Sequence, residues 1–194
     1  MANNLGLFVS TDITKCTGCK ACEMACFQSH NIKTNNVGRT VGTIATPVTP
    51  KLYVTVIETA SMPVQCKHCE NSPCKAVCQQ NAISRVNGQV IVDEIRCIGC
   101  KDCLMACPFG AIALLPFYLG GKAVLQPDSI EGKVAAAKCD LCYLDPEGPA
   151  CVRVCPNEAL KLTDVNEERK NKNIAAAEAL AIINAGDPGR RALS

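Results

Sequence analysis

The sequence predicts a small α+β protein that is stabilised by bound metal rather than by a large hydrophobic core. The 194 residues include sixteen cysteines, but only four phenylalanines, three tyrosines and no tryptophan. These are too few large apolar side chains for a conventional core of this size. Short strand-like segments alternate with the cysteine-rich stretches. Such a cysteine density is typical of a secreted disulfide framework or of a metal protein in a reducing compartment.

No segment of the sequence resembles an export signal or a membrane span. Residues 1–12 lack a basic start followed by a long apolar run. The longest apolar stretches, Ala111–Leu119 and Ile174–Ile183, fall short of the roughly 20 residues that cross a bilayer. We therefore expect a soluble, cytoplasmic protein, in which bound metal is favoured over disulfides.

The cysteines fall into four quartets, and none is left over. The first and third quartets share the spacing C-x2-C-x2-C-x3-C, the second reads C-x2-C-x4-C-x3-C, and the fourth reads C-x2-C-x8-C-x3-C. In chain order, the quartets are Cys16, Cys19, Cys22 and Cys26; Cys66, Cys69, Cys74 and Cys78; Cys97, Cys100, Cys103 and Cys107; and Cys139, Cys142, Cys151 and Cys155. A loop of this spacing reaches three corners of an iron-sulfur cube, and in bacterial two-cluster ferredoxins its last cysteine ligates the other cluster. The sequence therefore predicts four 4Fe-4S clusters.

The charge balance argues against a nucleic-acid partner. Twenty basic and eighteen acidic residues give a formal charge of +2, without the excess of basic residues that such partners require. An oxidised cubane with four thiolates carries a charge of about −2, so four clusters would bring the loaded protein to about −6.

An internal repeat accompanies the quartets. Similar segments follow three of them, namely Cys78–Ile83, Cys107–Ile112 and Cys155–Leu160, and we expect the segments after the fourth cysteines to begin as short helices. Gly18 and Gly99 occupy equivalent positions, where the backbone is expected to pass close to a cluster.

Strand signals lie between the quartets. Ile83–Val86 and Gln89–Val92 flank Asn87-Gly88, which predicts a tight hairpin. Lys51–Thr59 alternates like another strand. The segments 28–64 and 116–137 are insertions that a minimal two-cluster ferredoxin would not contain.

Structural zinc is the main alternative, because paired C-x2-C units can bind zinc through four thiolates. Zinc sites normally use two separated pairs, whereas these quartets crowd their cysteines, which favours cluster loops.

His68 lies inside the second quartet. Since sixteen thiolates already complete four cubanes, we expect His68 to donate a hydrogen bond near a cluster rather than to ligate iron. His30 is expected to be an ordinary loop residue.

Three motifs carry a family resemblance: Cys66-Lys-His-Cys-Glu-Asn-Ser-Pro-Cys74, Cys97-Ile-Gly-Cys100, and Lys138-Cys-Asp-Leu-Cys142 followed by Gly-Pro-Ala-Cys151. Over about Leu5–Thr163 the chain resembles the four-cluster electron-transfer subunits of molybdenum and tungsten oxidoreductases. It is most similar to small soluble members associated with formate dehydrogenases and hydrogenases, including formate hydrogenlyase and hydrogen-dependent carbon dioxide reductase. The resemblance implies two fused bacterial-ferredoxin-like modules related by pseudo-twofold symmetry.

The resemblance also implies which cysteines share a cluster. Cluster 1 takes Cys16, Cys19, Cys22 and Cys155; cluster 2 takes Cys139, Cys142, Cys151 and Cys26; cluster 3 takes Cys66, Cys69, Cys74 and Cys107; cluster 4 takes Cys97, Cys100, Cys103 and Cys78. The four-cluster domain then spans 1–163. One module comprises about 5–30 and 138–163, and the other comprises about 62–115.

These features predict an electron-transfer subunit with no catalytic residues of its own. We expect it to relay single electrons between a catalytic formate dehydrogenase or hydrogenase subunit and a second redox partner, which could include other iron-sulfur subunits. One alternative is a freely diffusing polyferredoxin that serves separate enzymes such as carbon monoxide dehydrogenase and hydrogenase. A more remote alternative is a zinc-stapled interaction module without a redox role.

The segment 164–194 is expected to form a helix of about 20 residues with a short tail. Asp164 with Glu167, or Asn166, can cap its start, and the segment 186–188, Gly-Asp-Pro, is expected to end it. The half over Ile174–Ala185 is apolar nearly all round. Such a surface predicts either docking to a partner or another copy, or packing back on its own module.

Overall fold

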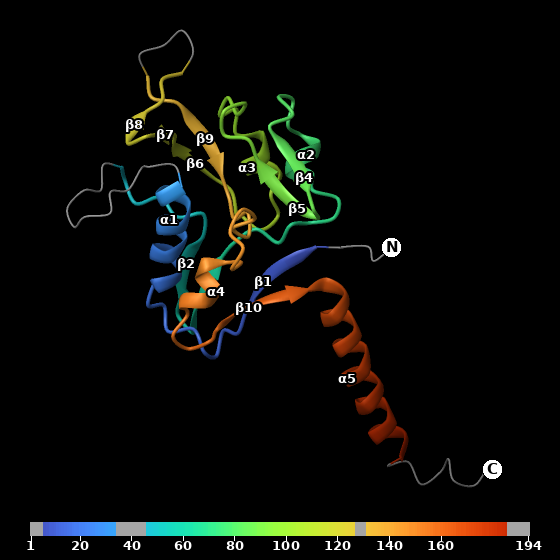
Figure 1. Ribbon diagram of the computed structural model, residues 1–194. Helices are drawn as coiled ribbons and strands as arrows, with labels where there is room; N and C mark the ends of the chain where they lie inside the picture. The colour runs from blue at the N-terminus through green and yellow to red at the C-terminus, as the bar shows by residue number, and fades with distance from the viewer. Residues whose placement is uncertain (1–5, 34–45, 127–130, 186–194) are drawn as a thin grey trace.

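The computed structural model describes residues 6–33, 46–126 and 131–185 as a set of short helices and strands (Figure 1). The helices are α1 (Ala21–Lys33), α2 (Pro73–Ala76), α3 (Asp102–Ala106), α4 (Ala150–Val154) and α5 (Val165–Ala185). The strands are β1 (Leu7–Thr11), β2 (Tyr53–Ile57), β3 (Ala60–Val64), β4 (Ile83–Val86), β5 (Gln89–Val92), β6 (Ala113–Pro116), β7 (Tyr118–Leu119), β8 (Lys122–Ala123), β9 (Val134–Ala137) and β10 (Leu160–Asp164). The mixture confirms the predicted α+β class.

The described strands pair two by two, and every pairing is antiparallel. Three pairs are hairpins, β2–β3, β4–β5 and β7–β8, whereas β1–β10 and β6–β9 join segments far apart in the sequence. In the β1–β10 pair, Leu7 lies opposite Asp164 and Thr11 opposite Leu160. Helix α1 packs against α4, and α2 packs against α3. The first quartet therefore lies near the fourth, and the second lies near the third.

The two predicted strand regions are confirmed. Asn87 and Gly88 both have positive φ, 49° and 83°, as a type I′ turn requires, and they join β4 to β5 with Val86 opposite Gln89. Strand β2 lies within the segment 51–59 that was expected to form a strand.

The buried side chains form two separate clusters, and cysteines belong to both. One cluster contains Cys74, Ala82, Ile83, Val90, Cys97, Cys103, Ile112, Ala135 and Ala136. The other contains Val9, Cys22, Cys26, Leu52, Cys139, Leu141, Cys151 and Leu160. Both are built from small and medium side chains around thiols, as expected for a fold in which bound metal replaces part of the core.

The prediction of short helices after the fourth cysteines is wrong for the second, third and fourth quartets. In each case a tight turn follows, in which the N–H three residues further on donates to the cysteine carbonyl, and a strand then begins. The donors Asn81, Gly110 and Glu158 all have φ between 50° and 59°. A left-handed residue at this point is incompatible with a continuing α-helix. The short helices α2, α3 and α4 instead precede the fourth cysteines.

Helix α5 confirms the predicted C-terminal helix. Its start is capped by Asp164, whose Oδ1 accepts hydrogen bonds from the N–H groups of Asn166 at 2.7 Å and Glu167 at 3.4 Å. The helix has 21 residues and projects away from the rest of the molecule (Figure 1). The expected stop at 186–188 lies outside the described residues. Within the described part of the chain, no helix is long and apolar enough to span a bilayer.

Candidate metal centres

Every quartet begins with the same bend in the backbone. The residue before the second cysteine has positive φ in all four loops: Gly18 (71°), His68 (51°), Gly99 (73°) and Leu141 (57°). Glycine adopts this conformation freely, whereas His68 and Leu141 are held in it by burial, with exposed fractions of 2% and 3%. The four loops therefore share one backbone bend between their first two cysteines.

The two glycines also allow close approach of neighbouring segments. A Cβ at Gly99 would lie 2.9 Å from Cγ2 and 3.0 Å from the carbonyl oxygen of Val134, and a Cβ at Gly18 would lie 2.9 Å from Oγ of Ser61. The close neighbours on this side are therefore protein atoms of β9 and β3. Gly99 also lines a cavity together with Cys78, Cys97, Cys100 and Cys103, and the expected approach of both glycines to a cluster stays a prediction.

Three cavities of similar size are each lined by four cysteines. Each has a volume of about 20 Å³. In that order, their cysteines are Cys16, Cys19, Cys22 and Cys155; Cys66, Cys69, Cys74 and Cys107; and Cys78, Cys97, Cys100 and Cys103. Each cavity combines three cysteines of one quartet with the fourth cysteine of another.

The remaining four cysteines lie in the most enclosed part of the molecule. Cys26, Cys139, Cys142 and Cys151 all have exposed fractions of 8% or less. The thiol of Cys26 interacts electrostatically with Cys142 and Cys151, and that of Cys139 interacts with Cys26 and Cys151. These four thiols therefore lie near one another.

The surroundings of the thiols suit ligation of a cationic metal core. Burial raises the pKa of Cys22 and Cys103 to about 11 and that of Cys151 to about 12. Free thiols there would keep their protons at neutral pH, so binding must displace the protons and supply positive charge. Backbone N–H groups donate to the sulfurs of Cys97 and Cys155 at 3.3 Å, which stabilises the thiolate form. Four thiolates per centre is the donor set of a 4Fe-4S cluster.

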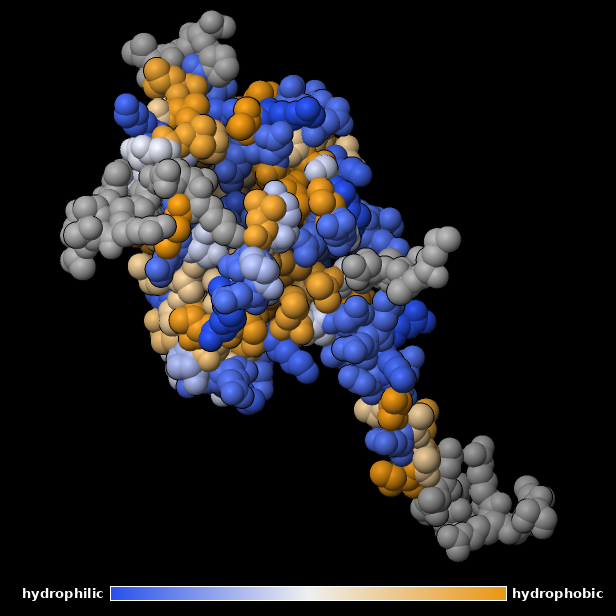
Figure 2. Space-filling model, viewed as in Figure 1, coloured by the Kyte–Doolittle hydropathy of each residue, from blue (hydrophilic) through white to orange (hydrophobic). Residues whose placement is uncertain are grey.

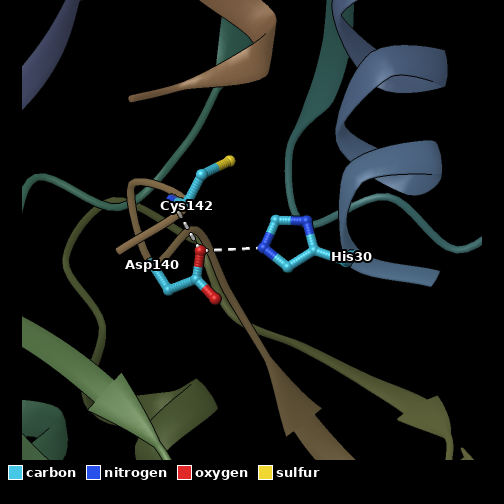
Figure 3. A group of neighbouring side chains, drawn as sticks. All are labelled: His30, Asp140 and Cys142. Atoms are coloured by element: carbon cyan, nitrogen blue, oxygen red, sulfur yellow. Dashed lines mark hydrogen bonds and ion pairs between the residues drawn. The ribbon is translucent and has the colours of Figure 1, made fainter. Parts of the chain in front are cut away.

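His30 belongs to a polar network that the sequence did not predict. It lies on α1 rather than in a loop, and its Nε2 is 2.8 Å from Oδ1 of Asp140, which also accepts the N–H of Cys142 at 2.9 Å (Figure 3). Lys51 Nζ lies 3.3 Å from the other Asp140 oxygen and 3.2 Å from Glu94. Within this group, His30, Asp140 and Cys142 lie close enough to share a metal ion. The network joins the fourth-quartet loop to α1. In the sequence, the four-residue spacing between Cys26 and His30 was the feature that could have indicated the position of His30 on a helix.

His68 has a buried side chain. Its Nδ1 accepts the Val90 N–H at 3.0 Å, and burial, reinforced by Lys138 and Arg85, lowers its pKa to about 3. The imidazole is therefore neutral and carries its proton on Nε2. Among the described residues Nε2 has no hydrogen-bond partner. This leaves a buried donor free to act on a neighbouring group, in the role that the sequence suggested.

Comparison with known proteins agrees with these centres. Two family models, each described as a 4Fe-4S dicluster domain, match residues 57–114 and 89–156. Two dicluster domains together with sixteen cysteines supply the ligands of four 4Fe-4S clusters.

Relatives from Escherichia coli (strain K12) cover most of the chain. Formate hydrogenlyase subunit 2 is 41% identical over 176 residues, which cover 81% of each chain. Electron transport protein HydN is 39% identical over 162 residues, 82% of this chain and 89% of the relative. Hydrogenase-4 component A is 36% identical over 203 residues, 93% of this chain and 94% of the relative. The chain therefore belongs to the 4Fe-4S dicluster family of ferredoxin-type proteins, and it is an iron-sulfur electron-transfer protein rather than an enzyme.

Proposed function

We propose that the four cysteine sets hold the clusters with exchanged fourth ligands. The sets are Cys16, Cys19, Cys22 and Cys155 for cluster 1; Cys26, Cys139, Cys142 and Cys151 for cluster 2; Cys66, Cys69, Cys74 and Cys107 for cluster 3; and Cys78, Cys97, Cys100 and Cys103 for cluster 4. The assignment is supported by the three cavities lined by four cysteines each and by the electrostatic contacts among the remaining four.

The same sets support a division into two ferredoxin-like modules related by pseudo-twofold symmetry. The outer module comprises about 5–30 and 138–163, and its segments meet through the β1–β10 pair and the contact of α1 with α4. The inner module comprises about 62–115, where α2 packs on α3. Each module has its own buried cluster of side chains. The insertions at about 28–64 and 116–137 contribute β2, β3, β7, β8 and β9.

The single observation that carries the proposed function is the grouping of the cysteines, which supports a linear order of the four sets. Cys22 and Cys151 lie in one buried cluster, which supports a position of set 1 beside set 2. Cys74 and Cys103 lie together in the other, which supports a position of set 3 beside set 4. Lys67 interacts with both Cys139 and Cys66, which supports a position of this lysine between sets 2 and 3.

Both ends of this line reach the surface. Cys19 in set 1 and Cys100 in set 4 are the two exposed cysteines. When bound, each cubane would accept and release one electron at a time. A line of four such sites with exposed ligands at both ends supports a relay between two partners.

The partners proposed for this relay are a catalytic formate dehydrogenase or hydrogenase subunit and a second redox protein. The relatives named as a formate hydrogenlyase subunit and a hydrogenase component support a subunit of a stable complex over a freely diffusing polyferredoxin. All sixteen cysteines are free of disulfides, which is typical of a reducing compartment such as the cytoplasm.

The relay predicts different behaviour for the chain alone and for its native complex. Under formate or hydrogen, the isolated, cluster-loaded chain is expected to stay oxidised, because its described residues offer no catalytic centre. The complex that co-purifies with it anaerobically should show reduced-cluster EPR signals with at least one of these donors. Reduction of the isolated chain would contradict a purely electron-transferring role. Elution of the native chain without any catalytic subunit would instead favour the diffusing carrier.

Helix α5 is proposed to join copies of the chain. Its apolar half is uncovered: the exposed fractions of Ile174, Leu180, Ile182 and Ile183 are 47%, 59%, 74% and 69%. Figure 2 shows hydrophobic surface on the outer part of the projecting helix, beyond a hydrophilic first part. The helix therefore does not pack back on its own module. Because the apolar surface runs nearly all round, covering it takes neighbours on several sides, which a bundle of equivalent helices supplies.

A further inference from the structure

Lys138 links the two modules from a buried position. It immediately precedes Cys139 of set 2, and its exposed fraction is 2%. Its Nζ donates to the carbonyl oxygen of Cys139 at 2.9 Å and to that of Val90. Val90 belongs to the buried cluster of the inner module, whereas Cys139 belongs to that of the outer module. The ammonium group therefore lies at the boundary between set 2 and set 3.

The charge of Lys138 is not balanced by a carboxylate among the described residues. Its only hydrogen-bond acceptors there are the two carbonyl oxygens. Lys51 provides a contrast, because it is also largely buried but forms ion pairs with Asp140 and Glu94. A buried ammonium without a counter-charge is strongly disfavoured, so an anionic group must lie near Lys138 in the functional protein.

The neighbouring thiols identify that anionic group. Lys138 donates to the carbonyl oxygen of Val90, and Val90 lines the cavity of set 3 together with Cys66, Cys69, Cys74 and Cys107. On its other side, Lys138 adjoins Cys139 of set 2. Lys67 lies at the same boundary, because it interacts electrostatically with Cys139 and Cys66. Its Nζ donates to the carbonyl oxygen of Val9 at 3.0 Å. Sets 2 and 3 each become anionic when loaded, since a four-thiolate cubane carries a charge of about −2.

We propose that Lys138 is a positioning residue whose buried charge is balanced by clusters 2 and 3 and raises the reduction potentials of both. Reduction adds one negative charge to a cluster, and a fixed cation nearby stabilises the reduced form more than the oxidised form. Lys138 thereby favours the arrival of electrons on both sides of the module boundary. This inference rests on the proposed ligand sets.

The test is an anaerobic EPR-monitored redox titration of the full chain carrying Lys138→Met. Two of the four one-electron steps are expected to move to lower potential, with the ratio of reduced to oxidised cluster falling at least tenfold at a fixed potential. For one electron this corresponds to about 59 mV. Lys138→Arg keeps the charge and should leave both steps near their original potentials.

Lys133→Met is the matched control for loss of a buried lysine. Lys133 has an exposed fraction of 7% and donates to the carbonyl oxygen of Ile95 at 2.5 Å, at the other end of β9. The Lys133→Met variant should not lower the reduction potentials of the same two steps. Unchanged potentials in a fully loaded Lys138→Met protein, or equal shifts in Lys133→Met, would overturn the proposal.

Iron content separates the possible failures. If Lys138→Met loses iron but Lys138→Arg keeps it, the positive charge is needed to hold the anionic clusters, in agreement with the proposal. If Lys138→Arg also loses iron, the role of Lys138 depends on shape rather than on charge, and the proposal fails. A wild-type chain without four clusters would contradict the ligand sets themselves, independently of Lys138.

Discussion

Replacing Cys155 by serine is expected to perturb cluster 1, although the other ligands proposed for this cluster belong to the first quartet. Cys155 lines the same cavity as Cys16, Cys19 and Cys22. Because serine oxygen is a poorer ligand than thiolate for iron-sulfur clusters, the variant should lose up to about four of sixteen irons and one set of EPR signals. Iron analysis and EPR of the anaerobically reduced protein measure both effects.

Two further serine variants make this test specific. Cys16→Ser removes a ligand from within the first quartet and should change the same EPR signals as Cys155→Ser. Cys151→Ser lies in the same quartet as Cys155 but belongs to the set of cluster 2, so it should change different signals. If Cys155→Ser matched Cys151→Ser and differed from Cys16→Ser, the exchange of fourth ligands would be wrong.

Deleting residues 165–194 is expected to abolish self-association while leaving all four clusters in place. Helix α5 touches the rest of the described protein mainly through β10, next to its own start. Its removal therefore exposes little of the cluster domain. Multi-angle light scattering under anaerobic conditions should report a larger species for the full chain and a monomer for the truncated one, with equal iron content per chain.

Point variants separate the apolar surface from the helix itself. Ile182→Glu combined with Ile183→Glu places charges at two of the most exposed apolar positions of α5 and should dissociate the assembly. Lys172→Ala removes only an exposed ion pair with Glu168, 3.5 Å long, and should leave the assembly intact because such pairs contribute little. Assembly that survives the truncation would contradict the role of α5. If the altered chain releases a different protein and not copies of itself, the helix binds a heterologous partner.

The local parts of this fold could be predicted from the sequence because their signals are local. The turn at Asn87-Gly88 needs two residues that tolerate positive φ, and both are present in the sequence. Helix α5 begins at a capping aspartate. The quartets themselves identify sixteen ligands, because cluster chemistry requires thiolates at short spacing.

The features that the sequence could not predict depend on tertiary contacts. Spacing alone does not say which quartets pair, and in the structure this is decided by contacts such as β1 with β10. His68 and Leu141 adopt the same left-handed bend as Gly18 and Gly99, but nothing local in these residue types favours it. Burial of their side chains holds the bend instead.

The wrong prediction of helices after the fourth cysteines and the unpredicted network around His30 have related causes. The segments after the fourth cysteines were expected to begin as helices, but left-handed residues such as Asn81 and Glu158 prevent a continuous helix there. The contact of His30 with Asp140 joins α1 to a loop far along the chain. The unbalanced burial of Lys138 is equally invisible in the sequence, where it is one of twenty basic residues.

The most direct test of the four-cluster account is the metal content of the anaerobically purified full chain. Because every cysteine is assigned to a cubane, about sixteen irons and sixteen sulfides per chain are expected, with negligible zinc. A zinc-stapled alternative would replace clusters by four-thiolate zinc sites. A result near eight irons and two zincs per chain would contradict the account.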